Sequence, residues 1–191
     1  MRAVPARLEE AIRTLLDEKS RVAAAIDGPC GSGKSTLAEA LSLMFPDSLV
    51  IRADDFFLRP HQRTAERLKE PGGNLDRERL KEEVLAPLKQ SCYQGHHRYN
   101  CQTGAMEPVP GNVGPLAIVE GSYTHHPDLR EYYDLAVFLD IGAETQLKRL
   151  RARCRDEALF QRFKSLWIPL ENAYFSRLQI REQADILIPA E

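Results

Sequence analysis

The sequence predicts an α/β fold in three layers, α/β/α, around a five-stranded parallel sheet. Five short runs are almost continuously apolar, as strands that are covered on both faces must be, and helical patterns lie between them, so that strand and helix alternate along the chain. A chain of 191 residues with 43% hydrophobic residues can bury one sizeable core and is too short for two ordinary domains. We therefore expect residues 1–191 to form a single domain. The expected strands are 22–27, 49–54, 116–120, 135–140 and 184–189.

Helical spacing of apolar residues predicts the elements between the strands. It indicates an amphipathic helix over 4–18, ahead of the first strand. Four more helices are expected at 34–45, 74–90, 143–153 and 156–180. The stretch 91–114 breaks the alternation, because glycines and prolines punctuate a polar run there. We expect this stretch to be an insertion in the form of a small hairpin.

Composition limits the kind of partner. A formal net charge of -2 and an isoelectric point near 6.2 argue against a surface built for nucleic acid or an anionic membrane. The first twenty residues mix both charge signs and resemble neither a signal nor a transit peptide, and no stretch has the roughly 20 apolar residues that cross a bilayer. We expect a cytoplasmic protein with no membrane partner, whose four cysteines are free thiols.

The motif that carries chemistry lies between the first strand and the helix that follows it. Residues 28–35 fit the pattern G-x-x-x-x-G-K-[ST] of a phosphate-binding P-loop, in the strand-to-helix context that the motif requires. Its glycines let backbone N–H groups turn inward around a phosphate. Lys34 is expected to bridge the β- and γ-phosphates of ATP, with the Ser35 hydroxyl on Mg²⁺. The other nucleotide-binding residues expected here are Gly28, Gly31, Ser32, Gly33 and Thr36.

A P-loop occurs in several classes of protein, and other features narrow the choice. A GTPase would need D-x-x-G and N-K-x-D motifs, and the sequence contains neither. A motor ATPase usually ends an apolar strand in adjacent acids, whereas the strand 116–120 ends in the single acid Glu120. Small-molecule kinases therefore fit best. A nucleotide-dependent regulatory ATPase or binding module stays open as an alternative, as does a nucleic-acid end kinase.

Several short motifs accompany the P-loop. They are Asp54-Asp55-Phe56-Phe57, Asn74-Leu75-Asp76, Glu120-Gly121-Ser122-Tyr123, Phe138-Leu139-Asp140 with the basic helix after it, and the closing strand Asp185-Ile186-Leu187-Ile188-Pro189. In these motifs, over about residues 21–189, the chain resembles the uridine kinase and phosphoribulokinase family of P-loop kinases. The resemblance implies transfer of the γ-phosphoryl group of ATP to a hydroxyl of a small molecule, with a nucleoside as the first expectation and pantothenate or a sugar as alternatives.

The resemblance implies roles for two strand-end acids. Asp54 matches the family's residue that accepts the proton of the attacking hydroxyl and binds the substrate. Asp55 is the alternative, because adjacent strand residues point to opposite faces of a sheet. Glu120 matches the acid that holds Mg²⁺ directly or through its waters. An ordinary polar strand end is the structural alternative for each of them.

Basic residues crowd the predicted helix 143–153 and the residues after it. Like charges this close repel unless anions separate them, so we expect a lid over about 148–162 that closes on ATP phosphates. Arg153 is the candidate for stabilising the transferred phosphoryl group, and Arg149 and Arg155 are candidates for nucleotide binding. A solvated helix or a small nucleic-acid patch is the alternative. The cluster consists of Lys148, Arg149, Arg151, Arg153, Arg155 and Arg162.

The acceptor side is less well specified. The resemblance implies that Asp76 grips a pair of ribose hydroxyls, and it places Arg98 and Tyr99 at the substrate as well. The residues that follow, 101–104, contain neither the aromatic ring nor the histidine with which uridine kinases recognise the pyrimidine. The sequence therefore leaves the acceptor unnamed, and it leaves the oligomeric state open.

Two further clusters have structural explanations. The cluster Phe163, Leu166, Trp167 and Leu170 has helical spacing and is expected in the core, although such a helix can also border the acceptor pocket. The array Cys92, His96, His97 and Cys101 has zinc-type ligands, but its spacing fits no common zinc module and adjacent histidines point apart. His125 and His126 are expected to be ordinary loop residues.

Overall fold

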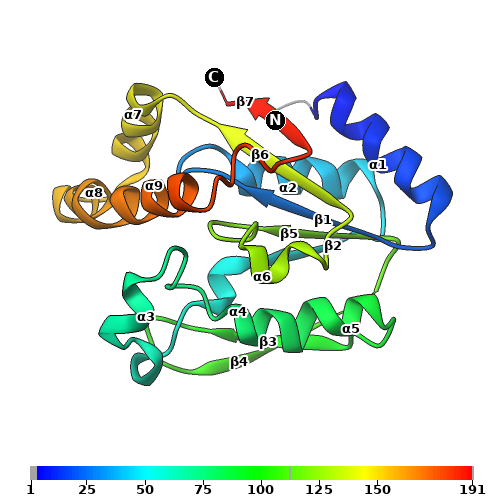
Figure 1. Ribbon diagram of the computed structural model, residues 1–191, viewed down its shortest axis with the longest axis horizontal. Coiled ribbons are helices and arrows are strands. Elements are labelled where there is room, and N and C mark those ends of the chain that lie inside the picture. Colours follow the sequence, from blue (N-terminus) through cyan, green and yellow to red (C-terminus); the bar gives the residue numbers. More distant parts are fainter. Residues whose placement is uncertain (1–3, 112, 191) are drawn as a thin grey trace.

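The computed structural model describes residues 4–111 and 113–190 and has the predicted three layers (Figure 1). Residues 1–3, 112 and 191, which the expected domain and insertion include, lie outside the described residues. Five parallel strands form the central sheet in the order β2-β5-β1-β6-β7. Their bounds are β1 Val22–Asp27, β2 Leu49–Arg52, β5 Leu116–Glu120, β6 Leu135–Asp140 and β7 Ile186–Pro189. The predicted α/β fold with a five-stranded parallel sheet is confirmed.

Two predicted strands are shorter than expected. The strand expected over 49–54 ends at Arg52, and Ala53–Phe56 form a 3₁₀ turn, η1. Residues three apart align in such a turn, so Ala53 and Phe56 are both buried, whereas Asp54 between them is exposed and Asp55 is half-buried. The strand expected from 184 begins at Ile186.

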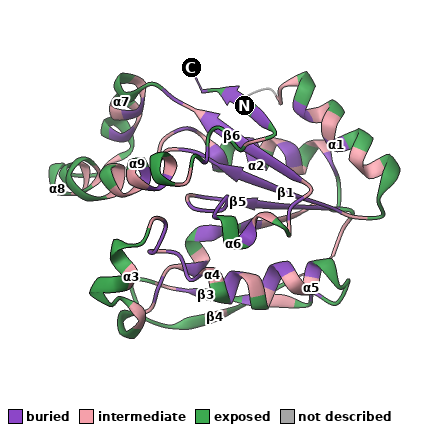
Figure 2. Ribbon diagram, in the orientation of Figure 1, coloured by how far each residue is buried: buried purple, intermediate pink, exposed green. Residues whose placement is uncertain are grey.

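One face of the sheet is covered by α1 (Ala6–Glu18) and α2 (Lys34–Met44). Leu8 and Ile12 of α1 and Leu37 and Leu41 of α2 are fully buried against the strands. The helix expected over 4–18 is thus present from Ala6. Figure 2 shows the buried sheet between layers whose outer surfaces are exposed.

The other face carries a longer set of helices. It comprises α4 (Arg77–Leu80), η3 (Lys81–Leu85), α5 (Ala86–Lys89), α6 (Pro127–Arg130) and α9 (Ile168–Arg177). Leu80, Val84, Leu129 and Tyr174 pack with Phe56 into the second half of the core. No described helix is long and apolar enough to cross a membrane.

Two of the predicted helices contain a π-helical turn. The helix expected over 74–90 is the continuous run α4, η3 and α5. The helix expected over 156–180 runs from α8 (Glu157–Arg162) through η4 (Phe163–Trp167) into α9. In both, a proline stands second in the segment after the π turn, Pro87 and Pro169. Proline lacks the N–H for an ordinary helical bond, and the wider turn accommodates this loss. The helix 143–153 is present as predicted, as α7 (Ala143–Arg153).

The insertion is the expected hairpin. Strands β3 (Gly95–Tyr99) and β4 (Met106–Pro110) pair antiparallel, apart from the main sheet. The segment between η1 and α4 holds the short turns η2 (Pro60–Gln62) and α3 (Ala65–Lys69). In Figure 1, the hairpin and α3 lie on one side of the molecule, and α7, α8 and α9 meet at one end of the sheet.

Candidate active site

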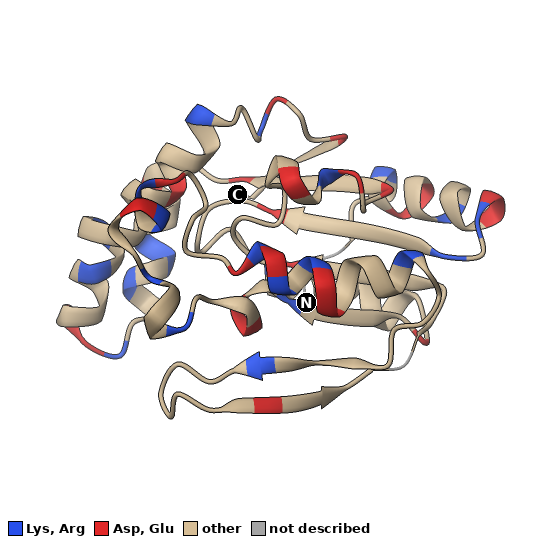
Figure 3. Ribbon diagram, turned by 60° about the horizontal axis from the view of Figure 1, so that its bottom comes forward, with Lys and Arg blue, Asp and Glu red and all other residues tan. Residues whose placement is uncertain are grey.

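A cavity of about 1380 Å³ opens at the carboxyl ends of the central strands, where ligands bind in open α/β sheets. Its walls come from the P-loop, from the segment 54–74, from the end of β5, from the hairpin and from the helices α7, α8 and α9. Figure 3 shows Lys and Arg residues crowded on the helices at this end of the molecule. The cavity therefore joins segments that lie far apart in the sequence.

The P-loop is folded as its glycines require. Gly28 has φ 141° and Gly33 has φ 98°, a region that side chains disfavour. A Cβ at Gly28 would lie 2.4 Å from the Leu139 carbonyl oxygen, so this position also lacks space for a side chain. The Lys34 ammonium spans the loop and donates to the carbonyl oxygens of Gly28 (2.6 Å) and Pro29 (3.2 Å). The loop opens the positive end of α2 toward the cavity, which suits a phosphate.

Ser35 and Glu120 are adjacent at the end of the loop. The Ser35 hydroxyl donates to Glu120 Oε1 at 3.0 Å. Glu120 is buried, which raises the pKa of its carboxyl, while the Ser35 hydrogen bond and the Lys34 charge oppose the shift. A hydroxyl and a carboxylate are hard oxygen donors of the kind that Mg²⁺ prefers alongside phosphate and water. The two residues predicted to hold Mg²⁺ are therefore together and chemically suited to it.

Asp54 and Asp55 have different surroundings in the 3₁₀ turn. Asp54 lines the cavity. Water reaches the Asp54 side chain, but the cavity walls partly desolvate it, and this desolvation raises the pKa of Asp54. The charges of Lys34 and Arg153 oppose the rise in pKa, and the charge of Asp55 adds to it. Asp55 Oδ2 instead lies 3.2 Å from His96 Nε2, whose Nδ1 is 2.8 Å from the Tyr93 hydroxyl. Only Asp54 of the two lines the cavity.

The predicted lid arginines separate into two groups. Arg149 reaches the P-loop carbonyl oxygens of Gly31 (3.4 Å) and Ser32 (3.5 Å), and Arg153 lines the cavity with its guanidinium over the Phe163 ring. Arg155 does not line the cavity: its side chain is 84% exposed and pairs with the adjacent Asp156. Because Arg155 follows the end of α7, it has left the helical face that Arg149 and Arg153 share.

Tyr99 is the predicted acceptor residue that lines the cavity beside Asp54. Asp76 is 2% exposed and caps α4, accepting from the backbone N–H of Arg79 (3.2 Å) and from Gln62 Nε2 (2.8 Å). Arg98 lies on the opposite face of β3 from Tyr99 and pairs with Glu107 across the hairpin. The structure thus brings neither Asp76 nor Arg98 to the cavity, because a cap and a cross-strand partner hold them elsewhere.

Sequence reasoning missed one buried acid of the site, Glu171 on α9. Its Oε2 accepts from the Cys30 N–H of the P-loop at 2.8 Å, and its Oε1 accepts from the Ser122 hydroxyl at 2.6 Å. Ser122 Oγ in turn lies 3.4 Å from Lys34 Nζ. Glu171 is only 4% exposed. A signal was present, because a lone acid on the buried side of a helix needs a polar partner.

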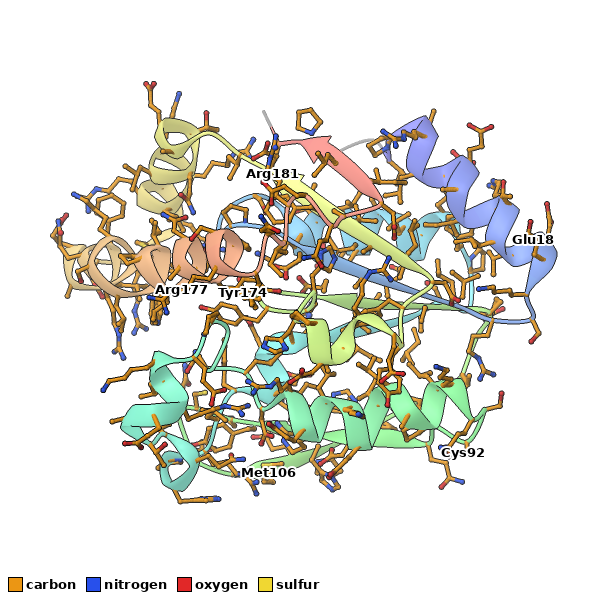
Figure 4. The ribbon with its side chains drawn as sticks, viewed as in Figure 1. Glu18, Cys92, Met106, Tyr174, Arg177 and Arg181 are labelled. Carbon is orange, nitrogen blue, oxygen red and sulfur yellow. The ribbon has the colours of Figure 1, made fainter. Side chains whose placement is uncertain are left out.

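The residues around Glu171 fix α9 against the sheet. Tyr174, labelled on α9 in Figure 4, donates to Asp27 Oδ2 at 2.9 Å. Asp27 also accepts from the N–H groups of Gly28 (2.7 Å) and His125 (3.0 Å).

Burial, followed by the Glu171 charge, raises the pKa of the Cys30 thiol to about 12. This thiol therefore stays protonated near neutral pH, and the four cysteines are free as expected.

One expectation for a side cluster needs correction. Phe163, Leu166, Trp167 and Leu170 do not belong to the core; they line the cavity, and Leu166 is 42% exposed. This is the alternative that the helical spacing left open. His125 and His126 are loop residues, as expected; both are buried, and burial lowers the pKa of each.

The zinc-type array is dispersed. His96 is buried, whereas His97, its neighbour on β3, is exposed. In the described parts of the chain, no three His, Cys, Asp or Glu side chains gather as a metal site would require.

Comparison with known proteins supports the fold. No family model and no curated protein matches the sequence. Solved structures match over nearly the whole chain. A protein from Bacillus stearothermophilus described as a possible uridine kinase has a TM-score of 0.67 at 20% identity, covering 95% of this chain and 99% of its own. A candidate fructose transport system kinase from Silicibacter sp. has a TM-score of 0.62 at 24% identity, covering 95% and 98%.

A third similar structure is YFH7 from Saccharomyces cerevisiae, described as a candidate P-loop kinase with a circular permutation. Its TM-score is 0.67 at 12% identity, and the match covers 97% of this chain and 98% of that one. At these identities the likeness concerns the fold. Together with the P-loop geometry, it shows that the chain has the fold of P-loop kinases.

Proposed function

We propose that the protein is an ATP-dependent kinase that transfers the γ-phosphoryl group to a hydroxyl of a small molecule. The observation that carries the proposal is the meeting of three groups in one cavity: the P-loop with Lys34, the pair Ser35 and Glu120, and Asp54. A phosphate cradle, a site suited to Mg²⁺ and a free carboxylate are the parts that phosphoryl transfer to an alcohol needs. We further propose that it acts in the cytoplasm, which suits its free cysteines.

The donor end would hold the triphosphate through charge and backbone dipoles. Lys34 and the N–H groups of residues 31–36 would bind the β- and γ-phosphates, and Arg149 and Arg153 would approach them from α7. Ser35 and Glu120 would hold Mg²⁺, which would supply positive charge to neutralise the phosphates. Glu171 would keep the P-loop and Ser122 in place around Lys34. Most of the rate enhancement in such a transfer comes from positioning and electrostatics.

Asp54 would act at the acceptor end of the same cavity. Its carboxylate would accept a hydrogen bond from the acceptor hydroxyl and take the proton as the oxygen attacks the γ-phosphorus. The raised pKa of Asp54 makes it a better proton acceptor than an ordinary aspartate. Lys34 and Arg153 would stabilise the charge on the transferred group.

A nucleoside is the acceptor that the family resemblance implies, but the site gives it little support. Asp76, the residue expected to grip a ribose diol, is bound within the protein. A sugar or pantothenate, the alternatives from the sequence, would likewise have to be recognised by the other residues of the cavity.

The proposal is tested by incubating the protein with ATP, Mg²⁺ and a panel of nucleosides, sugars, hydroxy acids and phosphorylated alcohols. One acceptor should stimulate ADP release and gain a phosphate, detected by mass spectrometry. If ADP release stays at the basal rate with every class of acceptor, the protein is a regulatory ATPase or a nucleotide-dependent binding module. Salt-sensitive phosphorylation of an oligonucleotide end would favour a nucleic-acid kinase instead.

A further inference from the structure

The acceptor end of the cavity contains a cation that the kinase chemistry does not use. Arg63 lines the cavity just after η2, on the wall formed by residues 57–74. Resting on the proposed function, we infer that the acceptor alcohol carries an anionic group, a carboxylate or a phosphate, which Arg63 binds, and that Arg162 on α8 assists from the lid side.

The state of Arg63 differs from that of most arginines in this protein. Its Nε donates to the Leu58 carbonyl oxygen at 2.9 Å, which orients the guanidinium and leaves its two terminal nitrogens available. No described carboxylate lies within ion-pair distance of it. Arginines outside the cavity are typically paired with acids, among them Arg13, Arg59, Arg67, Arg77, Arg79, Arg98, Arg130, Arg151 and Arg181.

Arg162 is similar on the facing wall. It lines the cavity from α8, and its guanidinium lies over the Trp167 ring, 5.1 Å from the centroid. No ion pair joins it to a described acid. The proposed function assigns Lys34, Arg149 and Arg153 to the donor phosphates, which leaves Arg63 and Arg162 as cavity cations without a role in binding ATP. An oriented guanidinium suits a carboxylate or phosphate, because it can donate two parallel hydrogen bonds.

The carboxylates of the cavity have the opposite distribution. Asp54, Glu120 and Glu171 are its acids, and all three lie close to the P-loop. Beyond Asp54, the acceptor end has no described carboxylate in its lining that could accept bonds from a polyol or a ribose diol. Hydroxyls of an acceptor could bond to neutral side chains of the lining such as Asn74 and Tyr99, whereas an anionic group would find cations.

The remaining lining suggests the body of the acceptor. Phe57 and Leu68 lie on one wall and Leu166 and Trp167 on the other, and Leu68 and Leu166 are 39% and 42% exposed. Large apolar side chains that are exposed at a cavity are typical of a site where a bound ligand covers them. We therefore expect an apolar segment between the hydroxyl and the anionic group of the acceptor.

The test uses alcohols in matched sets of three that share one aromatic or aliphatic body. Each set contains a neutral amide, the corresponding carboxylate and a phosphate ester. With ATP and Mg²⁺, phosphate gain should be confined to the anionic members, and the carboxylate and phosphate arms identify which anion is used. Arg63→Gln should raise the KM for the anionic acceptor at least about tenfold, with the KM for ATP unchanged, and Arg63→Lys should restore part of the loss.

The matched control is Arg177→Gln, because Arg177 is an exposed arginine at the end of α9 that does not line the cavity (Figure 4). It should leave both KM values unchanged. Equal turnover of neutral and anionic members, or an unchanged acceptor KM in Arg63→Gln, would overturn the inference while leaving the kinase intact.

Binding measurements separate failure of the inference from failure of the proposed function. The same compounds are titrated calorimetrically into the protein with Mg²⁺ and a non-hydrolysable ATP analogue. If no compound gains phosphate but anionic members bind to the wild type and not to Arg63→Gln, the anion site stands and the kinase function falls. If none of them binds either, both are wrong.

Discussion

The donor and acceptor ends of the cavity are built differently. At the donor end, Lys34, Glu120 and Glu171 are buried, and together with the exposed Ser35 they hydrogen-bond to the loop or to one another. At the acceptor end, aromatic and aliphatic side chains are partly exposed, and Arg63 has no acidic partner among the described residues. The donor end is thus preorganised by the protein, whereas the acceptor end leaves its contacts to a ligand.

The largest expected effect comes from removing the central cation of the donor end. Lys34→Ala should lower phosphoryl transfer by about 10²–10³-fold or more, because no other group spans the loop at that position. Steady-state kinetics with saturating acceptor measure the loss, and circular dichroism confirms that the variant is folded. Retention of wild-type turnover would mean that the donor end is not where the phosphates bind.

Glu171 tests whether the donor end depends on a distant helix. Glu171→Gln keeps the size of the side chain but removes its negative charge, and it replaces one acceptor oxygen with a donor, so the side chain can no longer accept from the Cys30 N–H and the Ser122 hydroxyl at the same time. We expect kcat/KM for ATP to fall about tenfold, with the KM for the acceptor little changed. Glu182→Gln, an exposed acid near the end of the chain, is the control. If the kinetic parameters for ATP and for the acceptor were impaired equally, Glu171 would have a general structural role.

The pH dependence reports on the ionisation of Asp54. Burial, assisted by the charge of Asp55, raises the pKa of Asp54 against the opposing charge of Lys34. Since the ionised form accepts the proton, kcat/KM should fall as the pH drops through this raised pKa, at a pH above the ordinary aspartate value of about 3.9. If kcat/KM fell only at or below the ordinary aspartate pKa, the desolvation of Asp54 would be contradicted.

The same shift predicts an effect on stability. A carboxyl whose pKa is raised by folding destabilises the folded state when it is ionised, so the cost is present above that pKa and disappears as the pH falls through it. Asp54→Asn should therefore melt at a higher temperature than the wild type at pH 7, and the difference should shrink in acid. Calorimetry at pH 7 and in acid measures the difference in melting temperature and its change with pH. If Asp54→Asn were less stable than the wild type at pH 7, the raised pKa of Asp54 would be contradicted.

The smallest expected effect concerns a residue that the structure excludes from the cavity. Arg98→Gln removes an exposed pair with Glu107, and solvent screens such pairs so that they contribute little to stability. Its KM values should stay within about twofold of the wild type, in contrast to Arg63→Gln. A large rise in acceptor KM would mean that the hairpin turns its outer face to the ligand.

The difference between the two ends also explains what the sequence could predict. The P-loop is contiguous, and Glu120 ends a strand beside it, so strand order alone brings these residues together. Asp76 and Arg98 each have a partner within their own segment. Asp76 caps the N-terminus of α4, and Arg98 pairs with Glu107 on the opposing strand. Arg63 lies on a segment whose placement depends on tertiary packing, so no local pattern indicated its part in the cavity. For Glu171 the signal was an acid on the buried side of a helix, which called for a polar partner but did not identify the P-loop as that partner.

The proton-accepting role of Asp54 is tested most directly by the single-turnover rate of phosphoryl transfer in Asp54→Asn, with Asp55→Asn as its matched neighbour. We expect Asp54→Asn to slow transfer by about 10²–10⁴-fold with the Kd for ATP unchanged, and Asp55→Asn to be much less impaired. Unchanged transfer in Asp54→Asn, or a greater loss in Asp55→Asn, would contradict this role.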